Sequence, residues 1–169
     1  MTFTSRNPDF TLLAGEEELQ TLRLNRLYRD WCQARRGRAL PPNDFIDPQR
    51  HSYLDGMLMI VDVERNDDRL RYRYRSVGHH FLAHLKVDPA GIYMDQHPDS
   101  AFALQAVRAC GLAVEARRPV HARIDREIDG RSFTVEFLLL PVAAAAAGSS
   151  AEAEVAVLLI AQIFTPVGD

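Results

Sequence analysis

Residues 155–164, VAVLLIAQIF, form a run that is apolar on both faces of a strand. Residues 57–63, MLMIVDV, have the same character. A strand with two buried faces must lie in the interior of a sheet that is covered on both sides. The two stretches therefore predict the central strands of one sheet, and they decide the fold.

Two further stretches alternate between apolar and polar residues. Residues 69–75 put Leu70, Tyr72 and Tyr74 on one face and arginines on the other, and residues 120–128 alternate in the same way. Such strands lie nearer a sheet edge, with one side in water. Turn-forming residues at 66–68 and 129–130 predict two hairpins, the second returning through a strand that carries Phe133, Val135, Phe137 and Leu139 on one face.

Helical periodicity appears in three places. In residues 16–35, an apolar stripe recurs at the i, i+3, i+4 and i+7 spacing of an amphipathic helix, and the glutamates at its start favour the positive end of the helix dipole. A short helix is expected at 79–85 and a longer one at 100–114, whereas 143–154 reads as a solvated loop. The expected order is helix, two strands, helices and three strands, which is an α+β architecture.

Composition limits the function classes. The chain has 169 residues, of which 47% are hydrophobic, and a formal net charge of −3, so one domain without a polyanionic partner is expected. No stretch reaches the ~18 apolar residues of a membrane span, and Cys32 and Cys110 suit free thiols in a reducing cytoplasm. The expected segments are a flexible N-terminus (1–15), a helix with connector (16–56), a core (57–165) and a tail (166–169).

Several spaced motifs resemble the opening signature of a bacterial PAS subfamily found largely in alphaproteobacteria. They are LYRDW at 27–31, RRGRALP at 35–41 and IDP at 46–48, with turn positions at 74–78 and 88–91. The resemblance covers residues 19–165 and departs from the family pattern at Asn43 and His79. It implies a PAS-like five-stranded antiparallel sheet with its first and last strands in the middle, intervening helices and an N-terminal amphipathic helix. The implied role is a sensory or protein-interaction module in bacterial signalling.

A PAS-like core is either packed solid or holds a small-molecule ligand between sheet and helices. The alternating strands and the segment after residue 91 supply the candidate ligand-binding residues. They are Tyr72, Tyr74, Tyr93, His97, Phe133 and Phe137. The ligand is not specified by sequence. Haem or flavin is not supported, because no residue stands out as a haem ligand and the surroundings of Cys110 do not resemble a flavin motif.

The stripe on the N-terminal helix must be buried somewhere. It consists of Leu24, Leu27, Tyr28 and Trp31. It can dock on the outer face of the sheet or on a second subunit, and the second alternative makes these residues the interface of a homodimer. An unidentified signalling protein is the other expected partner.

Other patterns carry less specific chemistry. His79, His80 and His84 lack the carboxylate or cysteine that would complete a metal site, and the arginines of residues 69–75 suit cross-strand pairing with acids better than nucleic-acid binding. No nucleophile, phosphate-loop or dinucleotide motif is present, so no catalytic residue is assigned. The rival hypothesis is a cone-shaped α+β enzyme of the ketosteroid isomerase-like kind, for which Asp95 and His97 are the nearest candidates.

Overall fold

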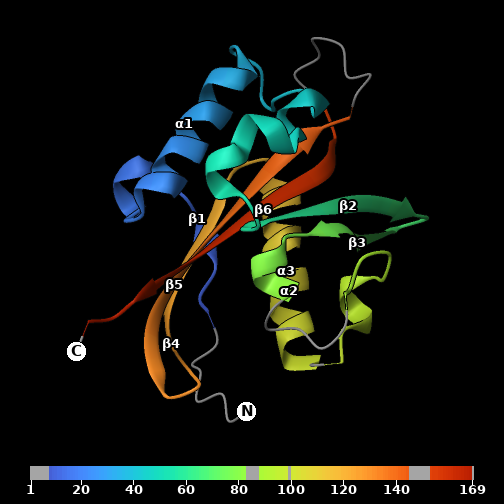
Figure 1. Ribbon diagram of the computed structural model, residues 1–169. Coiled ribbons are helices and arrows are strands. Elements are labelled where there is room, and N and C mark those ends of the chain that lie inside the picture. The colour runs from blue at the N-terminus through green and yellow to red at the C-terminus, as the bar shows by residue number, and fades with distance from the viewer. Residues whose placement is uncertain (1–7, 83–87, 99, 145–152, 169) are drawn as a thin grey trace.

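The computed structural model describes residues 8–82, 88–98, 100–144 and 153–168. They form an α+β structure around a six-stranded antiparallel open sheet with the order β1-β4-β5-β6-β2-β3 (Figure 1). The strands are β1 (Thr11–Leu12), β2 (Leu58–Asn66), β3 (Arg69–Val77), β4 (Val120–Ile128), β5 (Arg131–Ala143) and β6 (Val155–Pro166). The helices are α1 (Leu22–Arg35), α2 (His79–Leu82) and α3 (Ser100–Ala116), with 3₁₀ turns η1 (Glu16–Glu18), η2 (Asn43–Ile46), η3 (Pro48–Leu54) and η4 (Met94–Gln96).

The two apolar stretches form adjacent strands in the middle of the sheet, as predicted. β6 pairs with β5 along one side and with β2 along the other. Residues 157–163 of β6 are buried throughout, because helical elements cover both faces of the sheet. The alternating strands β3 and β4 lie toward the two edges.

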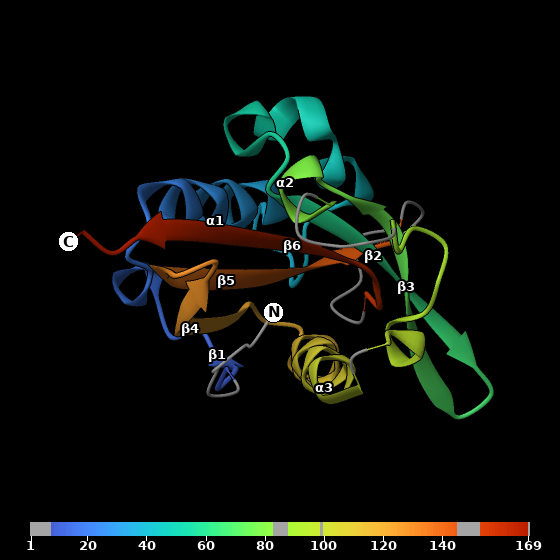
Figure 2. The same ribbon diagram turned by 60° about the horizontal axis from the view of Figure 1, so that its bottom comes forward.

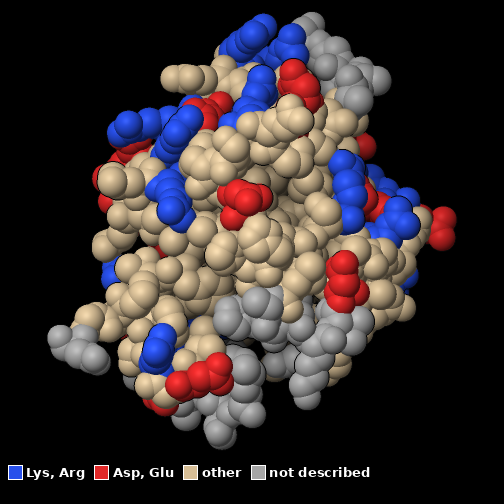
Figure 3. All heavy atoms as spheres, in the orientation of Figure 1, with Lys and Arg blue, Asp and Glu red and all other residues tan. Residues whose placement is uncertain are grey.

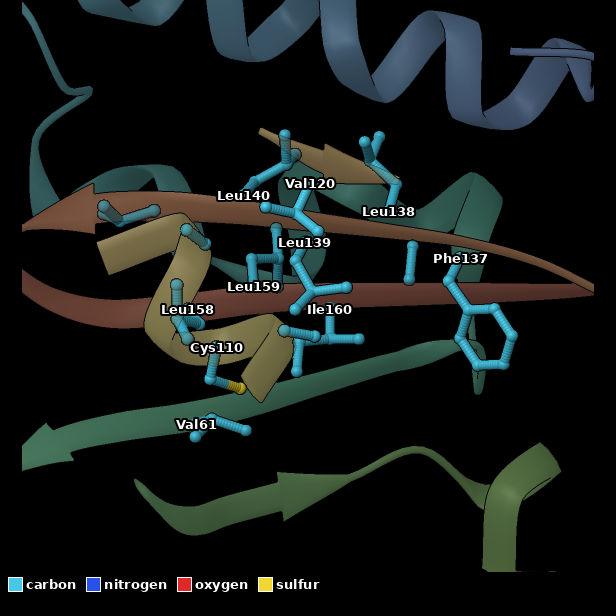
Figure 4. Close-up of a cluster of buried hydrophobic side chains, with 14 of the residues drawn as sticks. Val61, Cys110, Val120, Phe137, Leu138, Leu139, Leu140, Leu158, Leu159 and Ile160 are labelled. Atoms are coloured by element: carbon cyan, nitrogen blue, oxygen red, sulfur yellow. The ribbon is translucent and has the colours of Figure 1, made fainter. Parts of the chain in front are cut away.

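Each face of the sheet has its own helical cover. In Figure 2, α1 lies on one side of the sheet and α3 on the other, while η2 and η3 extend the cover on the α1 side. Figure 4 shows Cys110 of α3 facing Val61 of β2 and Leu158 of β6 across the core. The Cys110 thiol, Val61 and Leu158 are essentially inaccessible to solvent, so this contact is dry.

The outer edge of β3 is covered by the chain itself. The backbone N–H of Tyr74 donates to the carbonyl of Ile92 at 3.0 Å, and Gly91 donates back to Tyr74 at 2.7 Å. Arg73 and Tyr93 form an isolated antiparallel bridge at the same place. The segment before η4 therefore satisfies backbone groups that an edge strand would otherwise leave to water.

The N-terminal region differs from the prediction in two ways. Thr11 and Leu12, expected in a flexible N-terminus, pair with His121 and Val120 of β4, so the sheet has a sixth strand. The glutamates at 16–18 form a separate 3₁₀ turn, and α1 begins only at Leu22 without an acidic residue in its first turn. The predicted dipole interaction is therefore wrong, and a carboxylate from β5 takes that place.

Candidate functional site

Two buried tyrosines from β3 define the candidate site on the α3 face of the sheet. Strand alternation points Tyr72 and Tyr74 inward, and each side chain is only 4% exposed. Gly111 of α3 lies over Tyr72, since a Cβ atom added there would stand 3.6 Å from the phenol oxygen. The glycine has no side chain and so leaves room for that hydroxyl.

Sulfur groups line the same region. The Cys110 thiol donates to the Met94 sulfur at 3.6 Å, which ties α3 to η4. Burial raises the pKa of Cys110, so the group is a neutral thiol. The site is thus uncharged and mostly apolar, and its polar groups are the two phenols.

The phenol oxygens of Tyr72 and Tyr74 are not among the fully buried side-chain atoms that lack a hydrogen-bond partner. Among the described residues, neither Tyr72 nor Tyr74 has a hydrogen-bond partner for its side-chain oxygen. Burial raises the pKa of Tyr72 to about 12 and raises that of Tyr74 as well, so both are neutral donors at physiological pH. A neutral phenol on the inward face of a strand can donate a hydrogen bond to an acceptor on a small molecule.

The other predicted ligand residues do not join this pair. Tyr93 donates to Glu64 at 2.6 Å and lies under the guanidinium of Arg71, 3.5 Å from its ring centroid. The remaining three each pack on a different aromatic ring: His97 on Phe102, Phe137 on Phe10 and Phe133 on Phe164. Of the six residues, Tyr72 and Tyr74 are the two that neighbour each other on one face of a strand.

The predicted interface stripe lies inside the chain's own core. Leu24 and Leu27 are fully buried and Trp31 is 2% exposed. The Trp31 indole N–H donates to the Pro141 carbonyl of β5 at 2.9 Å, and Tyr28 stacks on the indole from the helix side. The stripe therefore docks on the outer face of the sheet, and it gives no reason to expect a second subunit.

Residues of the PAS-like motifs hold this helical cover in place. Asp30 accepts the Tyr53 hydroxyl at 2.9 Å, which joins α1 to η3. Pro41 accepts a backbone bond from Ala143 at 3.0 Å, and the Asp47 side chain accepts the Gln49 N–H at the start of η3. The motif positions thus have structural roles on the α1 face.

A buried carboxylate fixes the start of α1. Glu136 of β5 is 2% exposed, and its two oxygens accept the backbone N–H groups of Gln20 and Thr21, both at 2.9 Å. The Thr21 hydroxyl donates to the same carboxylate, and His121 Nε2 lies 3.1 Å from it. Sequence analysis missed this residue, although a lone acid in the apolar stretch 135–143 is a signal for a satisfied buried charge.

The hydrogen bonds of Glu136 make the free energy of unfolding depend on pH. Burial by itself would raise the pKa of Glu136, but hydrogen bonds from His121, Thr21 and the backbone N–H groups of Gln20 and Thr21 lower it from 4.5 to about 2. The unfolded chain therefore binds a proton at higher pH than the folded one. We expect Glu136 to contribute about 3 kcal/mol above pH 4.5, lost progressively as the pH falls toward 2. Denaturant titrations of the parent and of Glu136→Gln across this pH range measure the contribution. If the unfolding free energies of the two proteins changed with pH in parallel, the role given to Glu136 would be contradicted.

Three of the four arginines of β3 are paired with acids. Arg73 lies 2.8 Å from Glu64, Arg71 lies 2.9 Å from Asp95, and Arg75 bonds Asp62 through two nitrogens. The predicted cross-strand pairing is confirmed for Glu64 and Asp62 of β2, whereas Asp95 comes from η4. These charges stand on the face opposite Tyr72 and Tyr74, so they do not enter the candidate site.

The histidine group forms part of the surface. The rings of His79 and His80 lie 4.8 Å apart and both residues are exposed, while His84 lies outside the described residues. Within the described ranges, no group of three or more histidine, cysteine or acidic residues could hold a metal ion. Nor does any helix formed by those residues have the length and apolar character needed to cross a membrane.

No family model, no curated protein and no solved structure matches the chain.

Proposed function

We propose that the chain is a PAS-type sensory or protein-interaction module of bacterial signalling, acting in the cytoplasm, whose core takes a small neutral ligand. Strand order supports the proposal: apart from the short β1, the order is β3-β2-β6-β5-β4, with the first and last long strands in the centre. The helices between β3 and β4 occupy the position that the resemblance implies, and the motif residues Asp30, Trp31 and Asp47 each have a defined contact.

The observation that carries the ligand is the pair of neutral phenols on the inward face of β3. Tyr72 and Tyr74 offer two neutral donors in an uncharged environment, 4% exposed, beneath Gly111 and beside Cys110. A ligand with one or two acceptor oxygens on an apolar body complements these groups. A strongly charged ligand does not, because burying its charge without a partner is costly.

The rival enzyme requires an acid or base facing the interior. Asp95 is exposed and paired with Arg71, and His97 packs against Phe102. The buried pair His121 and Glu136 lies on the α1 face, where both carboxylate oxygens already accept bonds from Gln20 and Thr21. A carboxylate held in this way fixes structure and is unsuited to move a proton.

We expect Tyr74→Phe and Tyr72→Phe to leave the unliganded protein as stable as the parent or up to about 1 kcal/mol more stable, because each removes a hydroxyl that donates to no other described residue. The same changes should reduce the thermal stabilisation given by a bound ligand. Native mass spectrometry and absorption spectra of the purified chain identify what copurifies. Thermal unfolding in a panel of neutral ketones, quinones and lactones then measures binding by the parent and both variants.

Tyr93→Phe provides the matched control, since it removes a phenol that already donates to Glu64 outside the site. It should not change the stabilisation given by a ligand. The ligand proposal fails if nothing copurifies and no compound raises the unfolding temperature. It fails also if Tyr72→Phe and Tyr74→Phe destabilise the unliganded protein by as much as a lost satisfied hydrogen bond.

A further inference from the structure

Charge is distributed unevenly along the chain. Residues 22–38 contain six arginines and one acidic residue, Asp30, which gives this segment a net charge of +5. The whole chain has a net charge of −3, so the remainder carries −8. A local positive surface therefore stands on a protein that is otherwise acidic.

The fold gathers these arginines on the solvent side of α1. Helix periodicity places residues 22, 26, 29 and 33 on one side of α1, opposite the buried Leu24, Leu27 and Trp31. The exposed arginines on this side, next to it and just after the helix form the surface that we call the arginine ridge: Arg23, Arg26, Arg29, Arg36 and Arg38. Figure 3 shows basic side chains collected over α1 and the region above it.

The Arg26 side chain is oriented by contact with an aromatic ring. Its guanidinium lies 4.0 Å from the centroid of the Tyr53 ring, and the Tyr53 hydroxyl is itself fixed on Asp30 at 2.9 Å. A guanidinium stacked by its face keeps its N–H groups at the edges, where they can donate in pairs to a carboxylate. Stacking also reduces the side-chain entropy lost on binding.

An exposed apolar residue lies at the start of the same ridge. Leu22 is 84% exposed, the largest exposure among the large hydrophobic residues of the described chain. A partner that contacts both Leu22 and Arg26 would combine an apolar contact with carboxylate pairing. Arg29 is already paired with Glu16 at 2.6 Å, which limits the length of the freely positive surface.

We propose that the arginine ridge docks an acidic polypeptide segment of a partner protein. The inference rests on the proposed role as an interaction module, and it names the surface and the chemistry of the partner. A short acidic segment meets only the ridge, whereas an extended nucleic acid would also meet the acidic remainder of the surface and be repelled. Glu16 and Asp30, which interrupt the ridge, likewise favour spaced carboxylates over a continuous phosphate backbone.

The test uses the full chain and a fluorescein-labelled oligo-glutamate peptide with a leucine at one end, followed by fluorescence anisotropy. Arg26→Gln combined with Arg36→Gln should weaken binding about tenfold, since each lost charge contact accounts for a few-fold. Arg26→Lys, which keeps the charge but not the planar fork, should weaken binding less than Arg26→Gln. Binding should fall as salt rises.

The matched control is Arg69→Gln combined with Arg131→Gln, which removes two exposed arginines at the hairpin turns, away from α1. This control should bind the peptide as the parent does. Equal weakening in both double variants would overturn the proposal, because net charge alone would then explain binding. It would also be overturned by no binding at low salt, or by tighter binding of a single-stranded oligonucleotide than of the peptide. None of these outcomes depends on the tyrosine site, so the two proposals can fail separately.

Discussion

The Glu136→Gln variant is expected to lose about 3–5 kcal/mol of unfolding free energy, as when one partner of a buried charged cluster is removed. The reason is geometric. One carboxylate oxygen accepts from Gln20 N–H and His121, and the other accepts from the Thr21 N–H and hydroxyl. Whichever oxygen the glutamine replaces by NH₂, that group meets a backbone N–H, and two donors face each other in a site that is 2% exposed.

The loss is measured by denaturant unfolding, with fluorescence of Trp31, the single tryptophan, as the signal. Asp125→Asn is the control, because it removes one carboxylate from neighbouring β4, where the side chain is exposed and accepts the Thr134 hydroxyl at 2.9 Å. That change should cost about 1 kcal/mol or less. A Glu136→Gln loss no larger than the control's would contradict the role given to the buried carboxylate.

The Trp31→Ala variant is expected to lose a similar amount, about 3–5 kcal/mol, from the loss of buried apolar surface and the cavity left behind. Trp31 is 2% exposed and is the largest side chain between α1 and the sheet. Its removal also leaves the Pro141 carbonyl without the indole donor that lies 2.9 Å away. Circular dichroism follows unfolding here, since the fluorescent residue is gone.

Two further variants separate these contributions. Trp31→Phe keeps most of the ring and removes the donor, so it should cost about 1–3 kcal/mol. Leu22→Ala, on the same helix but 84% exposed, should change stability by no more than about 0.5 kcal/mol. If Trp31→Ala behaves like Leu22→Ala, α1 does not pack on the sheet as described.

The centre of the fold could be predicted from sequence because burial on two faces leaves a direct signature. No charged residue interrupts residues 155–164, and such a stretch is compatible only with a covered central strand. The strand at Thr11 and Leu12 could not be predicted, since two residues have no periodicity and their pairing depends on β4, more than a hundred residues away. The start of α1 was misplaced for the same reason: Glu136, not the local glutamates, satisfies the backbone there.

The part of the candidate site that could be predicted from sequence consists of side chains on a single strand. Tyr72 and Tyr74 stay together because alternation puts both on one face. Tyr93, His97, Phe133 and Phe137 share only their ring character, and their partners Glu64, Phe102, Phe164 and Phe10 depend on tertiary contacts. The number of arginines in residues 22–38 can be counted in the sequence. The stacking of Arg26 on Tyr53, in contrast, depends on the tertiary contact between α1 and η3.

The backbone hydrogen bonds between Tyr74 and residues Ile92 and Gly91 affect whether a strand of another molecule can add to this sheet. They occupy β3 backbone groups that a strand from a neighbouring chain would otherwise use, so polymerisation by strand addition is blocked at that point. On the other side, β1 covers only Val120 and His121 of β4 among the described residues. The rest of the β4 edge could pair with a strand of a neighbouring chain, and the exposed charges of Arg123, Asp125 and Glu127 oppose that pairing.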